Sequence, residues 1–112
     1  MVKHITPDRG DIVSLAFDPQ SGREQAGRRP AIVLSPRSYN AKVGLALLCP
    51  ITRHRKGYPF EVPLPEKMKT KGVVLDDHVK SLDWQARGAK VIERVSPAVL
   101  ADVLQKLELL LT

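Results

Sequence analysis

The stretch that decides the fold runs from Gly10 to Pro36 and reads GDIVSLAFDPQSGREQAGRRPAIVLSP. Its two short apolar runs, Ile12 to Phe17 and Ala31 to Leu34, predict two strands because glycine and proline punctuate the chain around them. The segment between the runs is long and polar, and it carries Glu24 and three arginines. A two-residue turn is enough to join two strands. A longer connection with this composition is either a flexible hairpin connection with solvent-facing charges or a functional loop.

Similar apolar runs continue along the chain and define its fold class. Together with the first two they predict five or six strands, arranged as a small closed barrel or a sandwich. No linker or repeat divides the chain, so residues 1–112 are expected to form one domain. The further runs are Leu45 to Ile51, Phe60 to Leu64, Val73 to Leu75 and, less regularly, Val79 to Ile92.

The periodicity changes to that of a helix near the C-terminus. Ser96 and Pro97 have the pattern of an N-cap and a first helical position. The apolar residues that follow recur at helical spacing and share one face, which predicts an amphipathic helix packed on the sheet. These residues are Val99, Leu100, Val103, Leu104, Leu107 and Leu111. A short helical turn is also expected at Ser38 to Lys42, where Gly44 limits its length.

Composition restricts the partners and the location of the protein. Eighteen Lys and Arg against twelve Asp and Glu give a net charge of +6, which favours an anionic partner such as nucleic acid or an acidic protein segment. A solvated basic surface would give the same charge. Cys49 is the single cysteine, so no internal disulfide can form, and a cytoplasmic location is expected. No Cys/His cluster has the spacing of a zinc site, so neither a metal nor a cofactor is expected.

The chain also lacks the sequence patterns of secretion and of membrane insertion. The N-terminal MVKHITPDRGD has no apolar core of signal-peptide length. No window approaches the roughly twenty apolar residues of a membrane span. We therefore expect no association with a membrane.

Several ordered segments together have the pattern of a known protein family. They are Gly10 to Pro36, Tyr39 and Asn40, CPIT ending at Thr52, KGYPFEV at Lys56 to Val62, GVVLDDHVKSLD at Gly72 to Asp83, and ARG at Ala86 to Gly88. In this order they resemble the MazF/PemK family of toxin endoribonucleases. The resemblance implies an SH3-like or CcdB-like small barrel, mainly β with a C-terminal helix, that forms a homodimer. It also implies metal-independent cleavage of single-stranded RNA, with messenger RNA as the expected target, and inhibition by a cognate acidic antitoxin of the MazE type.

The resemblance assigns catalysis to the arginine of a GxRP-type motif and the threonine of a PxT motif, which here are Arg29 and Thr52. A guanidinium is planar and always charged, so Arg29 is expected to stabilise the charge on the reacting phosphate. Thr52 is expected to bind a phosphate oxygen or the 2′-OH of the ribose. Glu24 is the candidate general base, because a carboxylate beside cations can accept a proton while they position it.

A second group of residues is expected to bind RNA without reacting. The run Arg53 to Lys56 is basic, which suits a solvated face or phosphate steering better than catalysis. His78 could read or stack on a base, although a histidine there is as often structural. Trp84 is expected to pack in the core or at a dimer contact. The predicted RNA-binding residues are Gln25, Arg28, Arg53, His54, Arg55, Lys56 and His78.

Two other functions remain open at this point. A toxin of the CcdB type, which poisons DNA gyrase, would share the barrel and the dimer but would bind a protein. Its aromatic-containing tail is absent here, since the chain stops at Leu110, Leu111 and Thr112. A non-catalytic nucleic-acid-binding barrel is the second alternative. Cleavage of RNA in the presence of a chelator separates the nuclease from both.

Overall fold

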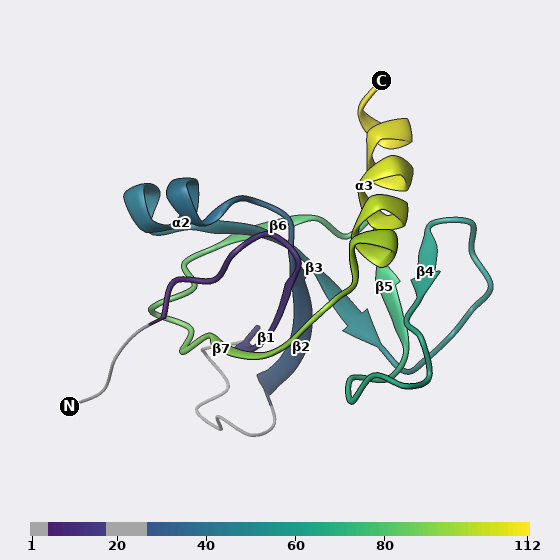
Figure 1. The fold of residues 1–112 in the computed structure, drawn as a ribbon, viewed down its shortest axis with the longest axis horizontal. Coiled ribbons are helices and arrows are strands. Elements are labelled where there is room, and N and C mark those ends of the chain that lie inside the picture. Colours follow the sequence, from purple (N-terminus) through teal and green to yellow (C-terminus); the bar gives the residue numbers. More distant parts are fainter. Residues whose placement is uncertain (1–4, 18–26) are drawn as a thin grey trace.

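In the described part of the chain, the fold is a seven-stranded antiparallel sheet with a helix at each end (Figure 1). A computed structural model describes residues 5–17 and 27–112. The strand order is β4-β5-β3-β2-β1-β7, and β6 pairs with β3 beside this path. The strands are β1 (Asp11–Ala16), β2 (Arg28–Val33), β3 (Ala46–Thr52), β4 (Glu61–Pro63), β5 (Val73–Leu75), β6 (Lys80–Leu82) and β7 (Lys90–Arg94), and the helices are α2 (Arg37–Val43) and α3 (Pro97–Leu111).

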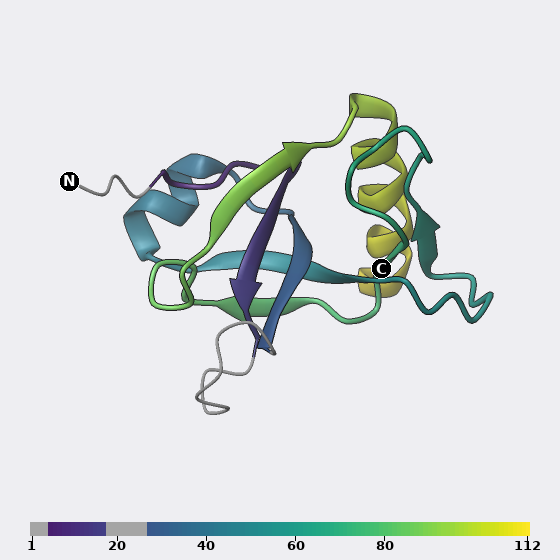
Figure 2. The same ribbon diagram turned by 90° about the horizontal axis from the view of Figure 1, so that it is seen from below.

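The strand β3 organises the sheet because it pairs with three neighbours. One register pairs Ala31 of β2 with Pro50. The beginning of β3 pairs with β6, and its last two residues, Ile51 and Thr52, pair with Val74 and Val73 of β5. In Figure 2, β1 and β2 cross β3 at a large angle, so the sheet is strongly twisted. Thr52 is therefore the point at which the main sheet passes into the β4–β5 hairpin.

The predicted closed barrel is present only as an open, curved sheet. β4 and β7 stand at the two ends of the strand order, and among the described residues no ladder joins them. The strands at these ends are short, with three residues in β4 and five in β7. The expected fold class, mainly β with a C-terminal helix, is confirmed.

Alternating residues of the strands build two hydrophobic clusters on opposite faces of the sheet. Ile12, Ile32 and Cys49 are fully buried in the cluster beneath α3. Their neighbours Val13 and Val33 face the other cluster, which also contains Trp84. The indole Nε1 of Trp84 donates to the carbonyl oxygen of Asn40 at 3.0 Å, so the expected packing role of this tryptophan is confirmed.

The C-terminal helix α3 begins as predicted. The Ser96 hydroxyl accepts a hydrogen bond from the backbone N–H of Val99, and Pro97 is the first helical residue. Val103 is fully buried, and Val99, Leu100, Leu104 and Leu107 pack against the same cluster. Leu111 was expected on this packed face, but it is 75% exposed. The reason is that the helix projects past the edge of the sheet (Figure 1).

The segment from Val79 to Ile92 differs from the single irregular strand that its sequence predicted. It contains two short strands, β6 and β7, separated by a turn. Within this turn the backbone N–H of Arg87 donates to the carbonyl of Asp83. The connection lets β6 pair with β3 while β7 pairs with β1 on the far side of the sheet.

Candidate active site

The two ends of the long polar loop are clamped together by the segment Ala86 to Gly88. Beside them, the N–H of Phe17 donates to the carbonyl of Gly27 at 2.9 Å. The Arg87 guanidinium donates to the carbonyl oxygens of Ala16 and Phe17 at 3.1 and 2.8 Å. The Arg28 Nη2 donates to the carbonyl of Gly88 at 2.8 Å. The ARG segment, which carries part of the family resemblance, thus has a structural role. It holds the described residues on either side of the segment that contains Glu24.

Arg28 and Arg29 open β2 and have different surroundings. Arg28 is half-buried, and its guanidinium donates to the Ser14 hydroxyl at 3.2 Å and the Ser14 carbonyl at 2.7 Å as well as to Gly88. Arg29 is exposed, and among the described residues its side chain makes no hydrogen bond. Arg28 is held by the fold, whereas the Arg29 guanidinium faces solvent in a groove.

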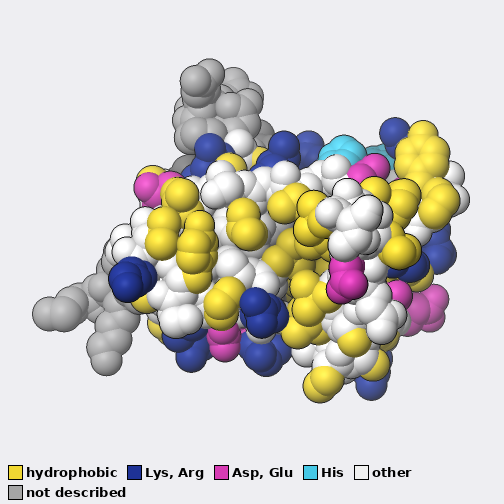
Figure 3. Space-filling view, turned by 90° about the horizontal axis from the view of Figure 1, so that it is seen from above, with side chains coloured by type: hydrophobic (Ala, Val, Ile, Leu, Met, Phe, Trp, Pro, Cys, Tyr) yellow, Lys and Arg dark blue, Asp and Glu magenta, His cyan; other side chains and the backbone are white. Residues whose placement is uncertain are grey.

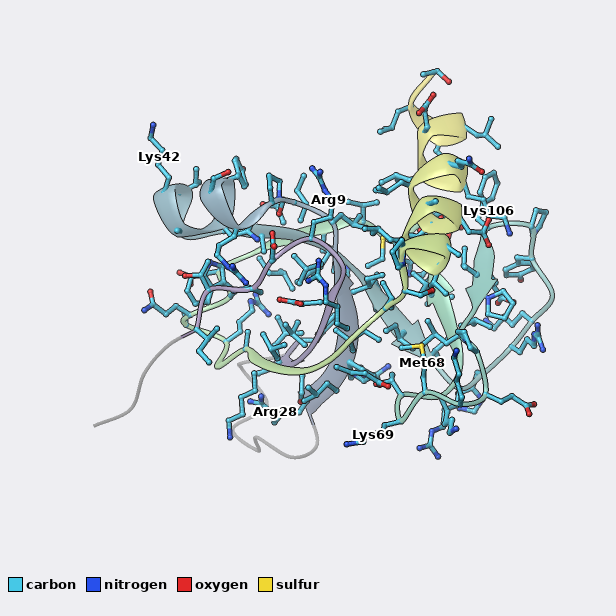
Figure 4. All side chains as sticks on the ribbon, in the orientation of Figure 1. Arg9, Arg28, Lys42, Met68, Lys69 and Lys106 are labelled. Carbon is cyan, nitrogen blue, oxygen red and sulfur yellow. The ribbon has the colours of Figure 1, made fainter. Side chains whose placement is uncertain are left out.

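The groove beside Arg29 has a volume of about 340 Å³ and is strongly cationic. Of the residues that line it, five are lysine or arginine, and within the described part of the chain none is acidic. The cations come from β2, from the residue that follows β3 and from the β4–β5 connection; they are Arg28, Arg29, Arg53, Lys69 and Lys71. Figure 4 shows Arg28 and Lys69 along one edge of the molecule. Such a surface is suited to a chain of phosphates.

Thr52 lies at the same end of the sheet as Arg29. Ala31 of β2 pairs with Pro50 of β3, and Arg29 precedes Ala31 by as many residues as Thr52 follows Pro50. Both residues lie past the last paired residues of this ladder, Ala31 and Pro50, so their meeting at one rim stays a prediction. The Thr52 hydroxyl oxygen accepts from the backbone N–H of His54 at 3.1 Å, so its O–H remains available as a donor.

The backbone at Thr52 is in close contact with Gly72. A Cβ at Gly72 would lie 2.1 Å from the carbonyl oxygen of Thr52 and 3.2 Å from the Cα of Arg53. Gly72 also has a φ of +121°, which L side chains rarely adopt. Only glycine fits at this position without displacing the chain at Thr52. The position of the candidate catalytic threonine thus depends on a residue that sequence reasoning did not select.

A second cavity, of about 400 Å³, lies on the other side of Thr52. It combines two imidazoles, a phenol and two carboxylates, which are groups that stack on or hydrogen-bond to nucleobases. The His78 Nε2 is 3.7 Å from the carboxylate of Asp77. The cavity is lined by Thr52, His54, Lys56, Tyr58, Glu61, Leu75, Asp77 and His78.

The loop that carries these basic residues is fixed by Glu61. The Glu61 carboxylate is buried and accepts hydrogen bonds from the backbone N–H of Lys56 at 3.0 Å and of Gly57 at 2.9 Å. A buried carboxylate that binds backbone N–H groups stabilises a loop without using its side chains. Glu61 was not selected from the sequence, although a lone carboxylate within an apolar strand is a recognisable feature.

The predicted site residues separate into four groups. Arg28, Arg29 and Arg53 line the cationic groove, and Thr52, His54, Lys56 and His78 line the second cavity. Arg55 is exposed and lines neither cavity. Glu24 and Gln25 lie outside the described residues. The structure adds Lys69, Lys71, Tyr58 and Asp77 to the two cavities.

Other reactive groups in the described residues lie away from this rim. Cys49 is buried, and its burial together with Asp76 and Asp77 raises the pKa of the thiol to about 12, so it is a poor nucleophile. Within residues 5–17 and 27–112, no three His, Cys, Asp or Glu gather as a metal site would require. No helix of the described chain is long and apolar enough to cross a membrane.

Comparison with known proteins agrees with this geometry. Residues 8–111 match the family described as PemK-like, MazF-like toxin of type II toxin-antitoxin system. The endoribonuclease toxin MazF of Escherichia coli (strain K12) is 48% identical over 111 residues, which cover 99% of both chains. A crystal structure of MazF from Deinococcus radiodurans is 52% identical, with a TM-score of 0.87 over 96% of this chain and 98% of that chain.

A further neighbour contains a second protein. It is a MazE-MazF crystal structure from Deinococcus radiodurans, 47% identical, with a TM-score of 0.86 over 96% of this chain and 97% of that chain. Sequence and fold thus agree along nearly the whole chain. The chain belongs to the PemK-like, MazF-like toxin family of type II toxin–antitoxin systems.

Proposed function

We propose that the protein is a toxin endoribonuclease that cleaves single-stranded RNA at a short sequence, with messenger RNA as its main target. The observation that supports this most directly is that Arg29, near the start of β2, and Thr52, the last residue of the adjacent antiparallel β3, line a cationic groove and a cavity that suits a base. The named relatives at 48% and 42% identity are endoribonuclease toxins, MazF and ChpB of Escherichia coli. They favour a nuclease over a gyrase poison or a non-catalytic barrel.

The reaction uses the 2′-OH of the ribose as the nucleophile. The 2′ oxygen attacks the adjacent phosphorus and loses its proton, while the P–O bond to the 5′ oxygen breaks and that oxygen gains a proton. The products are a 2′,3′-cyclic phosphate and a 5′-hydroxyl. No metal-activated water is required, because the nucleophile belongs to the substrate itself.

The residues have separate roles in this reaction. Arg29, exposed in the groove, stabilises the negative charge that grows on the phosphate oxygens in the transition state. The Thr52 hydroxyl oxygen accepts from the backbone N–H of His54, and its free O–H donates to a phosphate oxygen. Glu24 is proposed to accept the 2′-OH proton. A raised pKa would suit Glu24 for this step.

Recognition is proposed to follow the two cavities. The groove that contains Arg28 and Arg53 binds the RNA backbone, and the cavity that contains His54, Lys56 and His78 receives a splayed base. Gln25 and Arg55 would contact RNA from the loops. With aromatic residues at 4% of the sequence, hydrogen bonds rather than extensive stacking must supply the specificity.

Assembly and control are part of the same proposal. We propose a symmetric homodimer in the cytoplasm, where the buried thiol of Cys49 stays reduced. An acidic antitoxin segment of the MazE type, folding into the cationic groove, would displace the RNA backbone and block cleavage. The crystallised MazE-MazF complexes of the family support such a partner.

Sequencing of RNA 5′ ends after brief induction in living cells tests the proposal. Wild-type protein should create new ends at one short sequence in messenger RNA within minutes. The variant Arg29→Ala should lose at least about a hundredfold in cleavage rate, the scale on which one charge-stabilising group acts, with unchanged thermal unfolding. Unchanged RNA ends together with blocked DNA supercoiling would instead support the gyrase-directed alternative.

A further inference from the structure

The β4–β5 connection adds a second set of cations to the groove beside Arg29. Lys69 and Lys71 are both exposed and line the same cavity as Arg29 and Arg53, although they are far from them in the sequence. In Figure 4, Lys69 projects from the edge of the molecule at which Arg28 also lies. The groove therefore continues past the end of β3 onto a separate segment of the chain.

This segment is held in a defined conformation by a carboxylate from β7. The two Glu93 side-chain oxygens accept hydrogen bonds from the backbone N–H of Lys69 and of Thr70, both at 2.9 Å. These bonds, the Lys69 bond first, lower the pKa of Glu93, so its carboxylate is charged at neutral pH. Because Glu93 binds the backbone, the Lys69 ammonium is left to contact a ligand.

The Lys71 side chain is also held by a hydrogen bond. Its ammonium donates to the carbonyl oxygen of Glu66, and an ammonium has two further N–H groups that can bind an anion. The next residue, Gly72, touches the backbone of Thr52. The two lysines are thereby fixed relative to the candidate catalytic threonine, rather than carried on an independent loop.

The remaining lining of the groove indicates which part of a nucleic acid fits there. Apart from the cations it consists of the hydroxyls of Ser14 and Thr70 and the aliphatic side chains of Pro30, Ile51 and Ile92. Among the described residues it includes no aromatic ring on which a base could stack and no carboxylate that would repel a phosphate. Cations and hydroxyls without an aromatic platform suit phosphates rather than bases.

We propose that Lys69 and Lys71 form a phosphate-binding subsite that holds the RNA backbone next to the scissile phosphate, with Glu93 as the residue that positions it. The inference rests on the proposed ribonuclease function. The subsite acts on binding and not on the chemical step, because its cations hold a phosphate that does not react. Loss of the subsite should therefore raise KM and leave kcat nearly unchanged.

The test compares Lys69→Ala, Lys71→Ala and the double variant with the matched control Lys67→Ala. Lys67 is exposed on the same connection and carries the same charge, but it lines a different cavity, beside Arg94 and Pro97. The probe is a fluorescein-labelled 2′-O-methyl RNA of fourteen random nucleotides, which cannot be cleaved. Its affinity is measured by anisotropy between 50 and 200 mM salt, and cleavage is followed in parallel on unmodified RNA.

Each single variant should lower the slope of log affinity against log salt by about 0.7, the value for one phosphate contact on a single strand. The double variant should lower it by about twice as much, while Lys67→Ala should leave it unchanged. The charge-preserving Lys69→Arg and Lys71→Arg should restore binding. Cleavage at saturating RNA should stay within about twofold of wild type in every variant.

The outcomes separate this inference from the proposed function. If wild-type protein neither binds nor cleaves RNA, the ribonuclease proposal fails. If wild-type protein cleaves RNA but the Lys69 and Lys71 variants match Lys67→Ala in affinity and slope, the subsite is wrong and the ribonuclease stands. A loss of kcat in the double variant, with folding intact, would also overturn the assignment, because it would place the lysines in the chemical step.

Discussion

Arg28 and Arg29 are neighbours in the sequence, yet the fold uses them for different purposes. Arg28 donates to Ser14 and to Gly88, which ties the start of β2 to β1 and to the segment before β7. Arg29, the next residue of the strand, points to the opposite side and is exposed. Sequence reasoning placed Arg28 among the RNA contacts. Its two remaining Nη1 donors allow such a contact, but most of its hydrogen bonds already belong to the fold.

Asp76 is a buried carboxylate that the proposed mechanism does not use. Its side chain is fully buried, and among the described residues neither oxygen has a hydrogen-bond partner. Burial raises the pKa of Asp76 to about 7; Asp102 and Asp77 add to the increase, and Lys106 of α3 opposes it. At neutral pH the Asp76 carboxyl is therefore partly ionised, and its buried negative charge beneath α3 is unfavourable.

The pH dependence of stability should reveal Asp76. Because its folded-state pKa lies above the unfolded value of 3.8, the folded protein binds the proton more tightly. The contribution of this proton to the free energy of unfolding is therefore complete below about pH 4. It is lost as the pH rises through about 7, by up to roughly 4 kcal/mol. Asp76→Asn, which is always neutral, should unfold at a higher temperature than wild type at pH 8 and at a similar one only below about pH 4, where Asp76 is protonated in both states. Equal shifts at both pH values would show that Asp76 does not titrate in this range.

At the scale of elements, the contact between Gly72 and the end of β3 joins the fold to the site. Gly72→Ala would drive a methyl group into the Thr52 carbonyl, 2.1 Å away. We expect a loss of RNA cleavage of tenfold or more and a destabilisation of about 2 kcal/mol, since both the steric contact and the positive φ oppose alanine. Gly57→Ala is the control, because φ there is also positive but nothing lies within 4 Å of its Cβ. Cleavage rates and chemical denaturation measure the two effects, and equal losses in both variants would contradict the coupling to Thr52.

The elements differ in how far their sequences predict them. β1, β2 and β3 were predicted because their buried residues recur in short apolar runs, and α3 because Ser96 and Pro97 mark its start. β6 and β7 were not predicted as two separate strands, because their residues are mostly exposed and lack the alternation that marks a half-buried strand. Lys69 and Lys71 were missed for a different reason. They reach the groove only through the tertiary contacts of Glu93 and Gly72, which no local pattern records.

At the scale of the whole molecule, apolar and basic side chains are separated on the face that Figure 3 shows. Hydrophobic side chains gather over the middle of the face shown in Figure 3, with most Lys and Arg around its edge. The end of α3 contributes Leu109, Leu110 and Leu111, which are 71%, 42% and 75% exposed. An apolar helix end of this kind is typical of a surface that another chain covers. A second copy of the chain is the occupant that the proposed homodimer requires.

The homodimer can be tested at this helix end. Light scattering on wild-type protein at micromolar concentration should give twice the 12.4 kDa mass of the chain. Leu109→Lys combined with Leu111→Lys should shift the protein toward the monomer, because two desolvated charges would face the partner. Val43→Lys changes a similarly exposed residue on α2, at the opposite end of the molecule, and should remain dimeric. A monomeric wild type, or a double variant as dimeric as Val43→Lys, would contradict this interface.

The central claim is that the rim of Arg29 and Thr52 cleaves RNA through the substrate's own 2′-OH. The most direct measurement is end-group analysis of a single-stranded RNA treated with purified protein in excess EDTA. We predict cleavage that leaves a 2′,3′-cyclic phosphate and a 5′-hydroxyl, no cleavage when the 2′-OH at the cut site is replaced by hydrogen, and little cleavage of duplex RNA. Cleavage that requires added magnesium, or that leaves a 5′-phosphate and a 3′-hydroxyl, would contradict the account.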